Sequence, residues 1–130
     1  GTDVANEDMR IIESMPVKSL ITWPQTGLET ALGAPLAVRG HAWAGDRDVS
    51  AVNVSIDFGA SWQHAELSAP PNAGSWQTWN TEVSFPQTGY YEIWARATDD
   101  AGLMQPMVVP GWNPRGYLNN SCHRIAITLS

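Results

Sequence analysis

In the segment Val52-Asn53-Val54-Ser55-Ile56-Asp57-Phe58, apolar and polar side chains alternate strictly. Successive side chains of a β-strand point to opposite faces of the sheet, so this alternation predicts a strand with one buried and one hydrated face. We expect the apolar set to lie on the core side, and it consists of Val52, Val54, Ile56 and Phe58. The segment therefore favours a fold in which a β-sheet covers a hydrophobic core.

Comparable short segments flank this strand, separated by turn residues about every 8–12 positions. We predict further strands over residues 17–23, 36–43, 76–85, 90–98 and 124–129. One face of the 36–43 strand carries Leu36, Val38, Gly40 and Ala42. Because convincing helical periodicity is missing from the sequence, the pattern predicts an all-β sandwich of immunoglobulin-like type.

The 90–98 strand carries two candidate interface residues. Its inward face is expected to hold Tyr91, Ile93, Ala95 and Ala97, which places Trp94 and Arg96 on the face away from the core. A Trp beside an Arg on a flat sheet is typical of a protein interface. A second interpretation, of equal weight, is that the segment 103–120 covers both side chains.

Composition narrows the class of protein. A chain of 130 residues predicts one domain, which we place at 16–130, preceded by a polar and acidic linker or arm at 1–15. The net charge is −6 and there is no basic run, which argues against nucleic-acid binding. No apolar run is long enough for a membrane-spanning helix. The first residue is Gly1 rather than Met, so we expect the chain to be cut from a longer protein.

Residues with catalytic chemistry are scattered. Cys122 is the single cysteine, and His41, His64 and His123 lie on separate predicted elements, whereas a metal site needs clustered ligands. The sequence contains no nucleophile elbow and no phosphate-binding glycine loop. We therefore assign no catalytic residue and no metal ligand to this chain.

The segment Ser55-Ile56-Asp57-Phe58-Gly59-Ala60-Ser61-Trp62 fits the Asp-box hairpin, Ser-x-Asp-x-Gly-x-Ser-Trp. Asp57 is suited to accept hydrogen bonds from turn amides, and Gly59 to adopt a conformation that other residues resist. Trp62 is expected to pack back over the hairpin. Asp boxes occur in sialidase-type propellers, but a propeller needs repeated blades and this chain has no internal repeat. The motif therefore predicts a hairpin lock and not a catalytic site.

Five segments, in order along the chain, resemble the C-terminal dimerisation domain of the sulfite oxidase family of molybdenum enzymes. They are Met15-Pro16-Val17-Lys18-Ser19-Leu20-Ile21-Thr22, Gly40-His41-Ala42-Trp43-Ala44-Gly45, Val54-Ser55-Ile56-Asp57-Phe58-Gly59-Ala60-Ser61-Trp62, Arg96-Ala97-Thr98-Asp99-Asp100-Ala101-Gly102-Leu103-Met104-Gln105-Pro106 and Trp112-Asn113-Pro114-Arg115-Gly116-Tyr117. The resemblance implies an immunoglobulin-like sandwich that pairs with its copy in a homodimer.

The resemblance also implies a cofactor domain outside this chain. In the family a larger N-terminal domain binds molybdopterin and supplies the cysteine ligand of molybdenum, so this chain is expected to bind no cofactor and to be inactive alone. Cys122 is not expected to be that ligand. The parent would be a molybdenum-dependent sulfite oxidase or dehydrogenase, and the bacterial relatives suggest a periplasmic location.

The resemblance assigns substrate binding to Arg115. In sulfite oxidases the arginine of the Trp-Asn-x-Arg-Gly segment reaches the substrate pocket and binds the sulfite oxyanion. Trp112, also a candidate interface residue, and Pro114 would stiffen this segment. Pro114 and Cys122 depart from animal sulfite oxidases, which leaves sulfite and carrier-bound sulfur both open as substrates. Two alternatives remain, a pure dimerisation module and a free-standing carbohydrate- or protein-binding sandwich.

Overall fold

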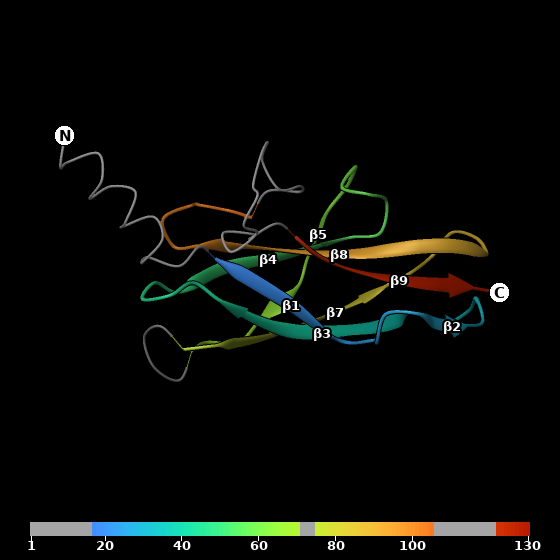
Figure 1. Ribbon diagram of the computed structural model, residues 1–130, viewed down its shortest axis with the longest axis horizontal. Coiled ribbons are helices and arrows are strands. Elements are labelled where there is room, and N and C mark those ends of the chain that lie inside the picture. Colours follow the sequence, from blue (N-terminus) through green and yellow to red (C-terminus); the bar gives the residue numbers. More distant parts are fainter. Residues whose placement is uncertain (1–16, 71–74, 106–121) are drawn as a thin grey trace, which may run out of the picture.

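The computed structural model describes residues 17–70, 75–105 and 122–130, and every regular element in these ranges is a β-strand. The strands are β1 Lys18–Trp23, β2 Leu28–Thr30, β3 Leu36–Trp43, β4 Val49–Ser55, β5 Gln63–His64, β6 Glu66–Leu67, β7 Gln77–Val83, β8 Gly89–Asp99 and β9 His123–Leu129. They form sheet A, in the order β1-β3-β7-β6, and sheet B, in the order β2-β9-β8-β4-β5 (Figure 1). The predicted all-β sandwich of immunoglobulin-like type is confirmed.

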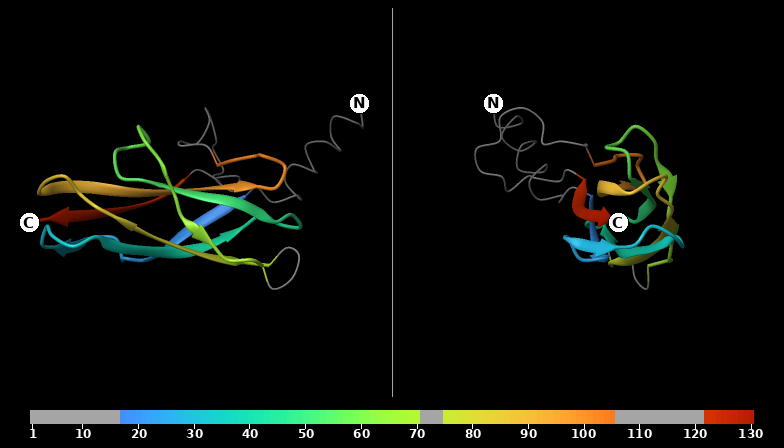
Figure 2. Two further views of the ribbon diagram at one scale, coloured as in Figure 1. Left: turned by 180° about the vertical axis from the view of Figure 1, so that it is seen from behind. Right: turned by 90° about the vertical axis from the view of Figure 1, so that its right-hand side faces the viewer.

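The two sheets face each other as layers, which the end-on view in Figure 2 shows. Between them lies one hydrophobic core, to which both sheets contribute alternate residues, for example Val38, Val52, Val54, Ile93 and Ile127. The side-chain period of two along each strand explains this arrangement, because it sends every second residue inward.

The six predicted strands all exist, but the 52–58 strand ends early. β4 stops at Ser55, so Val52 and Val54 are buried as expected, whereas Phe58 is 55% exposed. Phe58 lies in the turn after β4 with a positive φ of 59°. Its predicted place on the core face was wrong because the hydrogen bonds of Asp57 turn the chain before the alternation reaches Phe58.

Gly40 allows β3 to pack closely at the centre of sheet A. A Cβ atom at this position would overlap the carbonyl oxygen of Leu20 in β1 and lie 2.5 Å from Cζ2 of Trp79 in β7. The Trp79 indole is buried across the glycine, and its Nε1 donates a hydrogen bond to the carbonyl oxygen of His41 at 3.1 Å. The glycine thus makes room for the largest core side chain.

Two strands, β1 and β4, begin at one end of the sandwich. β1 begins there beside the end of β3, through the pair Lys18–Trp43, and β4 begins beside the end of β8, through Val49–Asp99. The predicted arm at 1–15 lies outside the described residues. We refer to this end as the Asp99 end.

Candidate functional site

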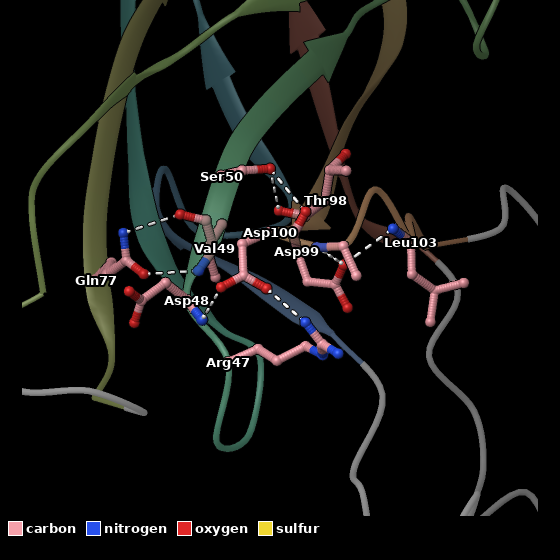
Figure 3. A network of polar contacts seen from close by, with 10 residues as sticks. Arg47, Asp48, Val49, Ser50, Gln77, Thr98, Asp99, Asp100 and Leu103 are labelled. Carbon is pink, nitrogen blue, oxygen red and sulfur yellow. Dashed lines mark hydrogen bonds and ion pairs between the residues drawn. The ribbon is translucent and has the colours of Figure 1, made fainter.

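A polar network holds the chain at the Asp99 end (Figure 3). Asp99 is buried, and its Oδ1 accepts hydrogen bonds from the backbone N–H groups of Ala101 and Leu103, each at 2.9 Å. Gly102, with a φ of 86°, supplies the left-handed conformation that this tight turn needs. A turn thus follows β8 directly, and a buried carboxylate fixes its shape.

The same network ties the β3–β4 connection to β8. Arg47 Nη1 donates to Asp100 Oδ1 at 3.0 Å, and this hydrogen bond lowers the pKa of Asp100. Ser50 Oγ donates to the carbonyl oxygen of Asp99 at 2.8 Å. An exposed ion pair of this kind contributes little to stability, so its main effect is to fix the geometry of the turn.

Gln105 is anchored in the core at the same end. Its Oε1 accepts hydrogen bonds from Ser19 Oγ at 2.6 Å and from the backbone N–H of Ala97 at 2.9 Å, which joins β1 to β8. Gln105 and Cys122, which flank the 106–121 segment, are both buried. Both boundaries of the 106–121 segment are thus fixed in the sandwich.

Two of the predicted site residues, Trp112 and Arg115, belong to this 106–121 segment and lie outside the described residues. The interface role of Trp112 and the substrate-binding role of Arg115 therefore stay predictions.

Trp94 lies on the outer face of β8, as the alternation predicts, but it is 6% exposed rather than open to solvent. Arg124 of β9 places its guanidinium 4.0 Å from the indole centroid, and the Phe58 ring meets it edge to face at 6.1 Å. The indole Nε1 donates to Glu92 Oε1 at 2.9 Å. The alternation could not reveal this cover, because Phe58 and Arg124 come from other parts of the chain.

Arg96 is half-buried on the same face. The Arg96 guanidinium stacks on Trp62 at 4.0 Å, so Trp62 contacts β8. The Nε of Arg96 is buried and has no hydrogen-bond partner among the described residues. Whether Trp94 and Arg96 contact another protein stays a prediction.

The Asp-box hairpin has the geometry that the motif predicts. Asp57 Oδ1 accepts from Ser55 Oγ at 2.7 Å and from the Ser61 backbone N–H at 2.9 Å, and Ser61 Oγ donates to the other carboxylate oxygen. These bonds, led by the one from Ser61 Oγ, lower the pKa of Asp57 to about 2. Gly59 adopts a φ of 85°. The described hydrogen-bond partners of the Asp57 carboxylate all belong to the same hairpin, so this carboxylate fixes the shape of the hairpin.

The described residues offer no metal site. No group of three His, Cys, Asp or Glu side chains in the described ranges could hold a metal ion. Burial raises the pKa of the Cys122 thiol, and the nearby charges of Arg96 and Arg124 counter this only in part. A buried thiol of this kind is a poor metal ligand, because metals bind the thiolate. Within the described ranges, no helix has the length and apolarity needed to cross a membrane.

Sequence reasoning missed an aromatic group on the outer face of sheet A. Trp76 is 45% exposed and stacks on Trp43 at 5.9 Å, and His41 meets its ring edge-on at 6.1 Å. Leu20, 43% exposed, lies next to His41 in the β1–β3 register. The signal was present, since the alternation that turns Gly40 and Ala42 inward turns His41 and Trp43 outward.

Comparison with known families decides what kind of domain carries these features. The family model of the Mo-co oxidoreductase dimerisation domain matches residues 9–130. This chain belongs to that family. The structure of the sulfane dehydrogenase SoxCD from Paracoccus pantotrophus contains the same fold, with a TM-score of 0.65 and 25% identity over 85% of this chain and 29% of that one.

Curated relatives of this dimerisation domain include two kinds of enzyme. Mitochondrial sulfite oxidase from Homo sapiens is 39% identical over 92% of this chain, and that match spans 23% of the relative. Inducible nitrate reductase [NADH] 1 from Glycine max is 33% identical over 88% of this chain and 14% of its own length. The chain therefore spans a quarter or less of these relatives.

Proposed function

We propose that this chain is the assembly domain of a sulfite oxidase-type molybdenum oxidoreductase and that it forms a homodimer. The observation that carries the proposal is the match of the dimerisation-domain family over residues 9–130. The chain spans 24% of the sulfite oxidase from Mus musculus, which leaves most of such an enzyme to other domains. The parent protein would therefore contain a separate domain for the cofactor.

The described residues of this chain do not fit a molybdenum–molybdopterin site. They include no three-ligand group, and the Cys122 thiol is buried with a raised pKa. The cofactor would instead be held by the rest of the parent enzyme, where it would supply the redox chemistry.

Within that enzyme, Arg115 is proposed to bind the oxyanion of the substrate. A guanidinium offers a rigid, permanently charged set of donors that matches an oxyanion. The anchoring of Gln105 and the burial of Cys122 support this role, since they fix both boundaries of the segment that carries Arg115. The substrate would be sulfite or carrier-bound sulfur, and the relatives named as nitrate reductases indicate that the domain type serves more than one oxyanion.

The test is an Arg115→Ala variant of the full-length enzyme. Losing one charge-assisted contact typically costs about 1.5–3 kcal/mol, so we expect KM for sulfite to rise roughly 10- to 150-fold. Arg47→Ala is the control, because Arg47 is an exposed arginine whose guanidinium pairs with Asp100. An unchanged KM in the Arg115 variant would leave the domain with a purely structural role in assembly.

A further inference from the structure

The outer face of sheet A exposes the indole of Trp76, whereas the exposed aromatic side chains on the sheet B side are Tyr90 and Phe58, at 59% and 55%. On sheet B, Trp94 is already stacked beneath Arg124 and is almost fully buried. On sheet A, Trp76 and Leu20 keep 45% and 43% of their surface exposed, and both lie near the same end of the sheet. Exposed Trp and Leu side chains grouped on a flat sheet are typical of a surface that another protein covers.

The registers of the strands place these residues in rows. Lys18 of β1 pairs with Trp43 of β3, and Trp43 stacks on Trp76 just before β7. The next row holds Leu20 and His41. The aromatic and apolar side chains of these two rows thus lie close to the Asp99 end, while Trp23 of β1, 39% exposed, lies beneath Arg39 farther along the face.

Beside these rows lies a polar groove of about 700 Å³, whose lining includes Arg39 of β3, Asn80 and Glu82 of β7, and Glu66 of β6. Arg39 lies opposite Asn80, and Asn80 lies opposite Glu66. The cations of the face, Arg39 and Lys18, therefore belong to its β1–β3 half, whereas Glu66 and Glu82 belong to its β7–β6 half.

This division of charge makes the face complementary to itself. A two-fold dimer uses the same patch on both copies, so each half must fit the other half. An axis that runs along the strands between β3 and β7 exchanges the two halves. It would place Trp43 against the partner's Trp76 and Arg39 against the partner's Asn80, close to the partner's Glu66 on β6 and the partner's Glu82 on β7.

We propose that the outer face of sheet A is the surface on which a second copy of this chain docks. The inference rests on the proposed homodimer and adds its location, its axis and its principal contacts. Trp76 and Leu20 form the apolar part of the contact near the Asp99 end, and the charged groove sets the orientation of the two copies.

The experiment compares two leucines of nearly equal exposure. Leu20→Glu places a like charge against the acidic half of the partner's face, and Leu32→Glu, at 39% exposure in the connection between β2 and β3, alters a site away from it. Sedimentation velocity of the full 130-residue chain over a range of concentrations gives the dimer dissociation constant. The loss of a residue that carries much of the binding energy of an interface typically weakens binding about thirty-fold or more. We expect that effect for Leu20→Glu and for Trp76→Lys, and an unchanged constant for Leu32→Glu.

Thermal unfolding of each variant checks that the exposed substitution leaves the fold intact. If the wild-type chain dimerises and both Leu20→Glu and Trp76→Lys dimerise equally well, the proposed face is wrong while the proposed homodimer stands. A wild-type chain that stays monomeric at every concentration overturns the homodimer and the face together.

Discussion

The Gly40→Ala substitution is the sharpest test of the packing in sheet A. The new Cβ would overlap the carbonyl oxygen of Leu20 and lie 2.5 and 2.7 Å from two atoms of the Trp79 indole. Carbon atoms in contact prefer separations of about 3.5–4.0 Å, so the indole would have to move by about 1 Å. The indole is buried and hydrogen-bonded to His41, which leaves it little room to do so.

The expected cost follows from these contacts. Overpacking of a core costs about 1–3 kcal/mol, and weakening the Trp79–His41 hydrogen bond adds about 1 kcal/mol. The free energy of unfolding of Gly40→Ala should therefore fall by about 2–4 kcal/mol. For a domain of this size, that corresponds to a midpoint roughly 8–16 °C lower.

Thermal unfolding followed by circular dichroism measures this change, with Gly33→Ala as the matched control. A Cβ at Gly33 would meet nothing within 4 Å. The control should be neutral or more stable by up to about 1 kcal/mol, since alanine restricts the unfolded chain. A Gly40→Ala midpoint within about 2 °C of wild type, less than 1 kcal/mol, would refute the close approach of β1, β3 and Trp79.

Two further predictions concern polar groups that connect the sheets. Gln77 of β7 accepts a hydrogen bond from the buried Val49 N–H of β4 at 2.8 Å and donates to its carbonyl oxygen at 3.2 Å, so Gln77→Leu should cost about 2–4 kcal/mol in chemical denaturation by leaving both groups unpaired. Gln63→Leu, which removes exposed amide bonds, should cost far less, and equal losses would contradict the role of burial. His123 Nδ1 accepts from the Ile21 N–H at 2.8 Å, and burial lowers the pKa of His123 below its usual 6.5. The unfolded chain therefore takes up the proton first, so stability should be constant above about pH 6.5 and fall as the pH drops through the folded pKa. Urea unfolding between about pH 8 and 5 measures this, and a His123→Gln variant with the same pH slope would contradict it.

Alternation along the chain predicted the strands well where one face is apolar. β3 has the bounds that its pattern predicts, because Val38 and Ala42 are buried while Arg39 and His41 face outward. The strands β2, β5 and β6 were missed. They span only two or three residues, too short for a period of two to be recognised. β2 also pairs in parallel with β9, a contact between distant segments that local pattern does not reveal.

At the candidate site, prediction from the sequence failed where hydrogen bonds turn the chain or where residues distant in the sequence bury a side chain. The motif around Asp57 predicted a locked hairpin, yet the lock also removed Phe58 from the strand that its apolar character suggested. The face of Trp94 followed from sequence, whereas its burial did not, since Arg124 and Phe58 are remote along the chain. The anchoring of Gln105 by Ser19 was equally beyond local pattern.

The most direct test of the proposed function measures molybdenum in the full product of the gene that encodes this chain. The protein would be expressed in a host that makes the molybdopterin cofactor and compared with the 130-residue chain alone by elemental mass spectrometry. We predict an equimolar amount of molybdenum in the full product and none in the shorter chain. A full product that carries no molybdenum, or that is no longer than this chain, would contradict the assignment to a molybdenum oxidoreductase.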